Sequence, residues 1–252
     1  MKALGLVHPD EVEVGARGVA GNRRFWLADE EGRLVDNKRH ASLVRIAPEW
    51  DEASRRLALA FPDGTRVEDI VELGDEFDTE RYPRAHPSRR VLGPFADAIS
   101  EYAGAAFTLL WAEGHAVDRV GRGTVSLVSR GSLARIAEEG GADEPLDGRR
   151  FRMLFEIDGV GAHEEDEWIG TQVQVGDAVL QLNGDVGRCA ITTHDPDTGV
   201  TDFDTLGTLA RYRREGRTEP LPFGVYGSVA VPGRVRVGDA VTPLQRSLLA
   251  AT

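Results

Sequence analysis

The chain of 252 residues carries 30 Lys and Arg against 42 Asp and Glu, a formal net charge of −12, which argues against nucleic acid as its main partner. Hydrophobic residues make up 41% and charged residues 29%, which excludes a wholly disordered or collagen-like chain. A single cysteine excludes an internal disulfide, and no apolar run approaches the roughly 18 residues of a membrane span. We therefore expect a soluble, cytoplasmic protein without a membrane partner.

Short apolar runs separated by turn signals dominate the first part of the chain. The runs 25–28 and 33–35 enclose an acidic turn that ends in glycine, and this pattern predicts a hairpin. Residues 43–46 form a further strand candidate, and a second hairpin is expected from 56–61 and 65–67. These runs indicate a β-barrel-like module at the N-terminal end.

Helices are inserted between the strands of the remaining chain. A helix over 95–102 should end at Gly104, and a second helix over 133–139 should be capped by Ser129 or Ser132. The other expected elements are strands at 107–111, 151–157, 172–175, 178–182 and 234–237, and a helix at 206–214.

Strands and helices do not alternate regularly, which argues against a doubly wound parallel sheet and for a barrel or mixed sheet. We expect a mainly β protein with α insertions (α+β). The polar segment 75–90, which contains two prolines, has the composition of a connection. The predicted domains are therefore residues 1–90 and residues 91–252.

Cys189 is the residue with the most distinctive chemistry. A lone cysteine is most often a small buried apolar side chain. The neighbouring Arg188 favours a thiolate, which attacks electrophiles, with His194 as the nearest base, or binds a soft metal. A zinc site needs about four grouped ligands, which one cysteine and 6 histidines scattered along the chain do not supply. If Cys189 binds a metal, a cofactor must supply most of the other ligands.

Three charged or polar segments have two interpretations each. Residues 195–199 form a turn by their Asx and glycine chemistry. The acidic run 164–167 is either a cation site or, as we expect, a solvated loop. Strand alternation around Phe151 predicts that Arg150 and Arg152 share one face, where they either grip a phosphate or pair with acidic side chains.

One long segment resembles a known family. Arg188 and Cys189 are followed by TTHDPDTG at 192–199, and then by 206–209 and by Tyr212 with its neighbouring Arg. Further matches follow the same order at 129–133, 150–152, 165–168, 223–226 and 233–241. Together these residues resemble the MOSC domain, the C-terminal part of molybdenum-cofactor sulfurases. Within that family, they resemble the group of the mitochondrial amidoxime reducing components and their bacterial counterparts.

The resemblance implies a MOSC-type β-barrel domain after the N-terminal module and a molybdenum pyranopterin cofactor bound between them. It implies that Cys189 is the metal ligand and that Arg152, Arg188 and Tyr226 lie in cofactor-binding segments. Lys38 stands where relatives carry a cofactor-binding arginine, and Lys lacks the bidentate fork of Arg. Pyridoxal phosphate binding is a further property that the resemblance suggests.

Three functions follow from the resemblance. The first is a molybdenum-dependent oxidoreductase that reduces N-hydroxylated small molecules such as amidoximes or hydroxylamines, with Asp195 as a catalytic residue on the substrate side and a separate electron-donor protein. The second is a sulfur carrier or cofactor-binding module with a persulfide on Cys189. The third is a cofactor-free structural relative. The third is favoured by residues 6–11, which lack the cofactor-binding Lys and Ser of relatives, and by Met153 and Leu154, which replace a Pro-Asn pair.

Overall fold

The computed structural model describes residues 1–77, 87–114 and 123–244. The packing of the chain divides it into two compact units. Unit 1 consists of Met1–His8, Gly21–Val120 and His194–Asp202, and unit 2 consists of Pro9–Ala20, Gly121–Thr193 and Phe203–Thr252. Each unit therefore combines three segments that are separated in the sequence. The division between residues 90 and 91 stays a prediction about domains.

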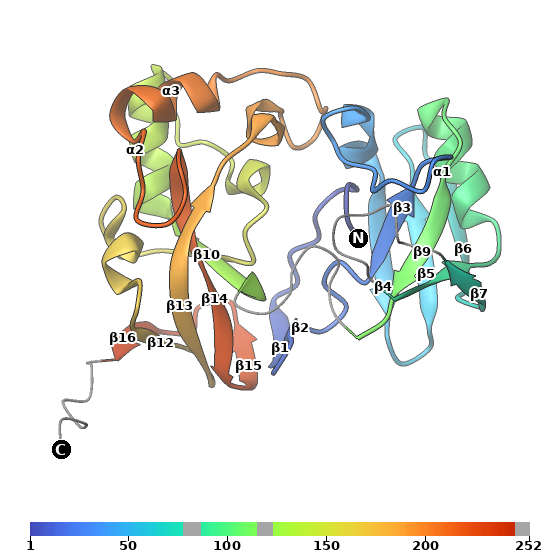
Figure 1. Ribbon diagram of the computed structural model, residues 1–252, viewed down its shortest axis with the longest axis horizontal. Helices are drawn as coiled ribbons and strands as arrows, with labels where there is room; N and C mark the ends of the chain where they lie inside the picture. Colours follow the sequence, from blue (N-terminus) through green and yellow to red (C-terminus); the bar gives the residue numbers. More distant parts are fainter. Residues whose placement is uncertain (78–86, 115–122, 245–252) are drawn as a thin grey trace. The chain divides into compact units, whose positions relative to one another are not determined.

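Unit 1 contains two antiparallel sheets (Figure 1). The first has the strand order β3-β9-β8-β7 and the second the order β4-β5-β6. Their bounds are β3 Phe25–Ala28, β4 Ala47–Asp51, β5 Arg56–Ala60, β6 Arg66–Ile70, β7 Leu73–Phe77, β8 Ser88–Val91 and β9 Thr108–Ala112. The predicted hairpins are confirmed, because Leu34 bridges back to Ala28 and β5 pairs with β6.

The core of unit 1 consists mostly of aliphatic side chains, and aromatic rings pack into and against it. Phe25 meets Trp50 edge-on, with ring centroids 5.0 Å apart, and Trp111 at 5.1 Å. Helix α1 (Phe95–Ala103) buries Phe95 and Ile99 and ends at Gly104 in the left-handed conformation, with φ 64°, as predicted.

One predicted strand of unit 1 is wrong. Residues 43–46 do not extend, since Ala41–Arg45 forms the 3-10 helix η1. Its bonds span three residues, from the amide of Leu43 to the carbonyl of His40 and from the amide of Ile46 to the carbonyl of Leu43. A run of four residues with buried Leu43 and Ile46 and an exposed Arg45 fits a helical turn and a strand equally well, which explains the error.

Unit 2 is built on a six-stranded sheet of order β11-β10-β14-β13-β12-β16 and a three-stranded sheet of order β15-β1-β2 (Figure 1). The bounds are β1 Glu11–Gly15, β2 Gly18–Val19, β10 Val125–Ser129, β11 Phe155–Ile157, β12 Gln172–Val175, β13 Ala178–Gly187, β14 Pro222–Val231, β15 Gly233–Arg236 and β16 Val241–Leu244. The long strands β13 and β14 pair antiparallel with register shifts and carry the centre of the sheet. The end of β13 leads directly to Cys189.

Two helices and three 3-10 turns complete the described part of unit 2. Helix α2 (Arg130–Gly140) is capped by Ser129, whose hydroxyl accepts from the amide of Ser132 at 3.0 Å, as predicted. Helix α3 (Thr205–Tyr212) is capped in the same way by Asp204. The turns are η3 Gly148–Phe151, η4 Glu164–Trp168 and η5 Ala190–Thr193.

The predicted strand 151–157 is wrong in its first half. Only Phe155–Ile157 pairs, as β11, whereas Gly148–Phe151 forms η3. The side chain of Asp147 accepts from the amide of Arg149 at 2.8 Å and starts this turn. The fold as a whole is mainly β with α insertions, as the sequence predicts.

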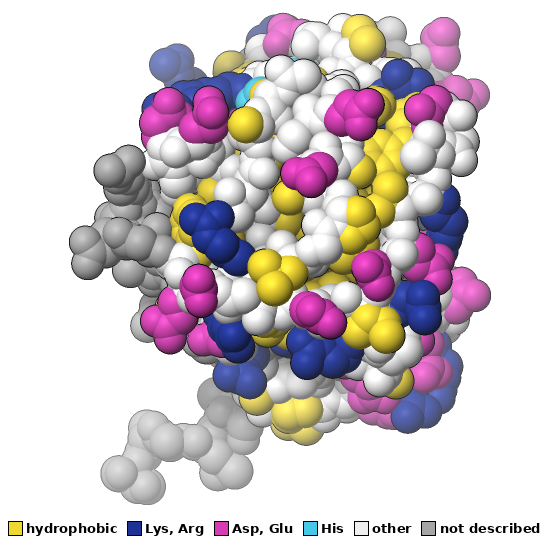
Figure 2. Space-filling model, turned by 90° about the vertical axis from the view of Figure 1, so that its right-hand side faces the viewer, with side chains coloured by type: hydrophobic (Ala, Val, Ile, Leu, Met, Phe, Trp, Pro, Cys, Tyr) yellow, Lys and Arg dark blue, Asp and Glu magenta, His cyan; other side chains and the backbone are white. Residues whose placement is uncertain are grey.

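The surface of the described chain mixes charges of both signs. Figure 2 shows acidic and basic side chains interspersed with hydrophobic ones over the face it presents. On the β4-β5-β6 sheet, Arg66 pairs with Glu49 at 2.7 Å and with Glu68 at 3.1 Å. Among the described residues, no helix is both long enough and apolar enough to cross a membrane.

Candidate functional site

Cys189 lies in unit 2 between the end of β13 and η5, and its side chain is exposed. The interpretation of this cysteine as a small buried side chain is therefore wrong. Its carbonyl accepts from the amide of Thr192 at 3.1 Å and from the hydroxyl of Thr192 at 3.0 Å. The backbone that carries the thiol is thus fixed while the sulfur faces outward.

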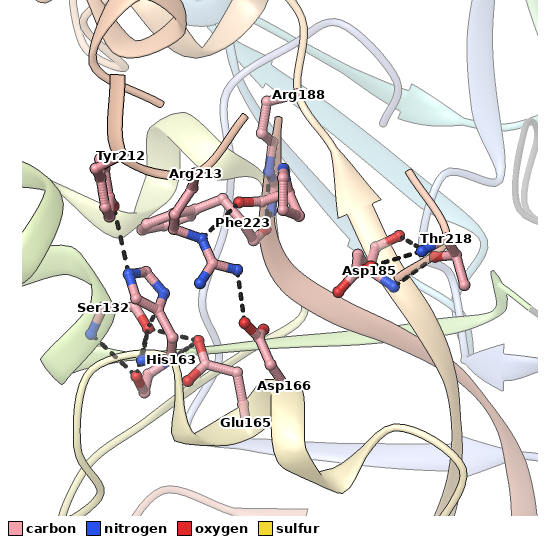
Figure 3. Close-up of polar contacts among 12 residues, drawn as sticks. Ser132, His163, Glu165, Asp166, Asp185, Arg188, Tyr212, Arg213, Thr218 and Phe223 are labelled. Atoms are coloured by element: carbon pink, nitrogen blue, oxygen red, sulfur yellow. Dashed lines mark hydrogen bonds and ion pairs between the residues drawn. The ribbon is translucent and has the colours of Figure 1, made fainter. Parts of the chain in front are cut away.

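Arg188 turns its guanidinium into unit 2, beside Phe223 (Figure 3). Its Nε donates to the Phe223 carbonyl at 2.9 Å, and its Nη1 donates to the Phe151 carbonyl at 2.9 Å. The rings of Phe151 and Phe223 stack with centroids 4.2 Å apart, and the guanidinium lies over both. These contacts place Arg188 in the framework that supports Cys189.

The two arginines of the segment 150–152 do not share a strand face, so that prediction is wrong. Arg150 is buried and donates from Nη1 to the carbonyl of Thr192 at 3.3 Å. Arg152 is half-buried and has a left-handed backbone, with φ 53°, at the end of η3. A non-glycine residue in this conformation costs roughly 1 kcal/mol, which marks the turn as held by its surroundings.

Tyr226 lies half-buried in the middle of β14, paired with Ser126 on β10 and Gly184 on β13. A β-carbon at Gly184 would come within 2.8 Å of the Tyr226 hydroxyl oxygen and 2.6 Å of the Thr218 hydroxyl oxygen. Glycine at this position therefore leaves room for the phenol. Sequence reasoning missed Gly184, although a glycine inside a long strand is a signal of close approach.

Lys38 and Asp195 belong to unit 1. Lys38 is exposed, and its amide donates to a carboxylate oxygen of Asp36 at 3.0 Å. Asp195 Oδ1 accepts from the amides of Asp197 at 3.1 Å and Thr198 at 2.8 Å, and from the Thr198 hydroxyl at 2.7 Å. The turn predicted at 195–199 is confirmed, and this carboxylate oxygen helps to hold it.

A buried polar cluster in unit 2, here called the Glu165 cluster, was not predicted. It consists of Ser129, Ser132, His163, Glu165 and Tyr212, and Figure 3 labels all of them except Ser129. Glu165 has no exposed surface, and its Oε1 accepts from the Ser129 amide at 3.1 Å and the Ser132 hydroxyl at 2.7 Å. Among the described residues, Glu165 Oε2 is buried without a hydrogen-bond partner.

The hydrogen bonds of the cluster determine the tautomer of His163. The single proton of the Ser132 hydroxyl goes to Glu165, so Ser132 Oγ can only accept from His163 Nδ1, which lies 3.2 Å away. Nδ1 therefore carries the ring proton, and Nε2 accepts from the Tyr212 hydroxyl at 3.4 Å. The result is a chain of donors that runs from Tyr212 through His163 and Ser132 to Glu165.

Burial controls the titration of the groups in and beside the cluster. Desolvation, with smaller effects of Arg213 and Arg135, lowers the pKa of His163 to about 3. Desolvation also raises the pKa of Tyr212 to about 12 and, against the ion pair with Arg213, raises the pKa of Asp166. The Asp166–Arg213 pair is 2.6 Å long and half-buried. His163 is therefore neutral at physiological pH.

The expectation of a solvated loop at 164–167 is wrong for the backbone and for Glu165, whereas Glu164 and Glu167 are exposed as expected. These residues begin η4, in which Glu165 and Trp168 are the buried positions. The spacing of three residues matches one turn of a 3-10 helix, so the two side chains fall on one face. The sequence signal for this face is Trp168, a large apolar residue three positions after Glu165. It predicts a buried tryptophan, but it does not predict that a carboxylate is buried beside it.

The stability of the protein is expected to fall between pH 7 and pH 5 by about 1 to 2 kcal/mol through His163, after allowance for its partial exposure. Its folded pKa of about 3 lies below the usual 6.5, so the unfolded chain binds the extra proton in this range. Stability present above pH 6.5 is therefore lost as the pH falls towards 3. Urea unfolding of wild type and His163→Asn at both pH values measures it. Equal pH slopes would contradict the assignment.

Protein side chains alone do not supply a metal site within the described residues, where no group of three or more His, Cys, Asp or Glu is placed to hold an ion. A single exposed thiol at Cys189 remains, with Arg152 and Arg150 on the neighbouring turn. This donor set fits an anionic cofactor that brings its own metal ligands. It does not fit a structural zinc site.

The fold and the site together define a class of protein: mainly β, with an exposed cysteine at the end of a central strand. The MOSC domain model matches residues 114–242, just over half of the chain. The chain belongs to the MOSC domain family.

Curated relatives are amidoxime-reducing components. Mitochondrial amidoxime-reducing component 1 of Mus musculus is 41% identical over 98 residues, which cover 36% of this chain and 28% of that protein. The Xenopus laevis protein of the same name is 25% identical over 281 aligned residues, covering 98% of this chain and 80% of that protein. The match thus covers less than a third of the length of the mouse protein. Neither pyridoxal phosphate binding nor a sulfur-carrier role is supported by these relatives.

Solved structures give weaker likenesses. YiiM from Geobacillus stearothermophilus has a TM-score of 0.37 and 15% identity, covering 50% of this chain and 56% of that one. The YUAD protein from Bacillus subtilis has a TM-score of 0.36 and 14% identity, covering 75% of this chain and 92% of that one.

Proposed function

We propose that this chain is a molybdenum-cofactor oxidoreductase that reduces N-hydroxylated small molecules of the amidoxime or hydroxylamine type. The observation that carries the proposal is the exposed thiol of Cys189 at the end of β13, within the segment that matches the MOSC domain. The names of the curated relatives favour the same substrate class. A separate electron-donor protein and a small-molecule substrate are the partners that this function requires.

The residues identified from the family resemblance take roles in the proposal. Cys189 is the metal ligand, since a thiolate is the soft donor that such a metal prefers. Arg152, Tyr226 and Lys38 bind the anionic and polar parts of the cofactor, and the two cations neutralise its phosphate. When bound, the cofactor supplies a two-electron redox centre. Asp195 lines the substrate side, where its carboxylate orients a substrate N–H or O–H group.

Metal analysis of the full chain, produced in a host that makes the cofactor, tests the proposal. About one molybdenum per chain is expected, because a single thiol at Cys189 holds one metal centre. Reduction of benzamidoxime with an artificial electron donor should accompany the metal. Protein from a host unable to make the cofactor is the control and should show neither. Persistent absence of molybdenum from the first preparation would refute the proposal, and cyanide-labile sulfur on Cys189 would then indicate a persulfide carrier.

A further inference from the structure

Arg188, the residue before Cys189, connects three separate segments of unit 2. Its Nη2 donates to the Phe223 carbonyl and to Met153 Sδ, the latter at 3.0 Å, in addition to the bonds from Nε and Nη1. Its own amide donates to the carbonyl of Leu221 at 3.2 Å. One side chain and its amide therefore tie the end of β13 to the turn after η3 and to the segment that enters β14.

The hydrogen bonds described for this guanidinium go to framework atoms. An arginine offers five N–H groups in a fixed planar fork, and here they reach two backbone carbonyls and a thioether sulfur. The stacked rings of Phe151 and Phe223 lie against its face at 5.2 and 6.0 Å from their centroids. This geometry sets the direction of the chain at Arg188 and so determines where the next residue, Cys189, is placed.

The same side chain holds the turn that carries Arg152. The bonded atoms of Phe151 and Met153 flank Arg152 on both sides. The left-handed backbone of Arg152 is unfavourable for a residue with a β-carbon, so the turn needs such contacts to persist. The metal ligand and one cofactor-binding cation of the proposed function thus depend on one common support.

We propose that Arg188 is a positioning residue, which fixes Cys189 and Arg152 relative to each other by spanning the Phe151 and Phe223 carbonyls. This inference deepens the proposed function and rests on it for its catalytic consequence. A contact between Arg188 and the cofactor phosphate is the alternative role. The two roles make different predictions for the cofactor-free protein. A residue that only binds the cofactor phosphate has no partner there, whereas a positioning residue still holds the backbone.

Amide hydrogen exchange of the cofactor-free full chain tests this inference. In Arg188→Met, exchange in peptides 150–154 and 188–193 should be at least about tenfold faster than in wild type, because local opening becomes easier. Peptide 172–182, in β12 and β13, should be unchanged. Arg188→Lys keeps the charge but lacks the fork, so it should match the Met variant within about threefold. Arg130→Met, which removes an exposed guanidinium of α2, is the matched control and should exchange as wild type.

Unchanged exchange at both peptides in Arg188→Met would overturn the inference, and so would an equal increase in peptide 172–182, which indicates global destabilisation. If Arg188→Met does not fold, Arg188→Lys is compared with wild type in its place. In cofactor-loaded protein the Met variant should hold less molybdenum than Arg130→Met. If wild type holds no molybdenum, the proposed function fails, whereas the exchange data still decide the role of Arg188.

Discussion

Replacement of Glu165 by alanine is expected to lower the free energy of unfolding by about 3 to 5 kcal/mol. The substitution leaves the Ser129 amide and the Ser132 hydroxyl buried without their acceptor. It also leaves a cavity in a fully buried position and removes the end of the donor chain that orients His163. Urea unfolding followed by fluorescence of the 4 tryptophans measures the loss.

Two further variants show whether the loss comes from the acceptor. Glu165→Gln keeps a carbonyl oxygen at Oε1 and nearly the same volume, so the expected loss is only about 1 to 2 kcal/mol. Glu167→Ala removes an exposed carboxylate from the same 3-10 helix and should change stability by less than about 0.5 kcal/mol. An unfolding midpoint of Glu165→Ala equal to that of Glu167→Ala would contradict the role of Glu165.

Elements with local start and stop chemistry were predictable from the sequence. Helix α2 is the clearest case, because the Ser129 cap and the glycine at 141, with φ 76°, are readable without tertiary context. The turn at 195–199 is another, since Asp195 bonds its own backbone. In both, the residues that define the structure lie within a few positions of one another.

Elements defined by tertiary contacts were not predictable. The run 43–46 and the segment 148–152 have apolar and basic side chains that fit a strand, yet both fold as 3-10 turns. In the second segment, bonds from Arg188, more than thirty residues away, hold the turn. Periodicity over four residues contains no information about such partners.

The candidate site was predictable in part. The sequence motif identified Cys189. Its exposure arises because it lies just after the end of β13, outside the buried part of the sheet. Composition alone could not show this, since a lone cysteine is most often buried. Glu165 shows the opposite error, because a carboxylate in an acidic run is normally solvated, whereas this one is buried and accepts from the Ser129 amide and the Ser132 hydroxyl at the start of α2. Burial of a single side chain depends on its neighbours in space.

Substitution of Cys189 by serine is expected to lower both the molybdenum content and the rate of amidoxime reduction at least about tenfold. The reason is that a hydroxyl is a hard donor that is protonated at neutral pH. The fold should be retained. The thiol is exposed, so its replacement should change the free energy of unfolding by less than about 0.5 kcal/mol. Metal content, turnover with an artificial donor and urea unfolding are measured on the same preparation.

Ala190→Ser is the matched control for this substitution. It adds a hydroxyl at the next exposed position and leaves the thiol in place, so metal content and turnover should remain within about twofold of wild type. A difference between the two variants assigns the effect to the sulfur rather than to a new hydroxyl beside η5. Full molybdenum content in Cys189→Ser would exclude the thiolate as the metal ligand. The cofactor would then have to be held by the cations alone, and the exposed position of the sulfur would need another explanation.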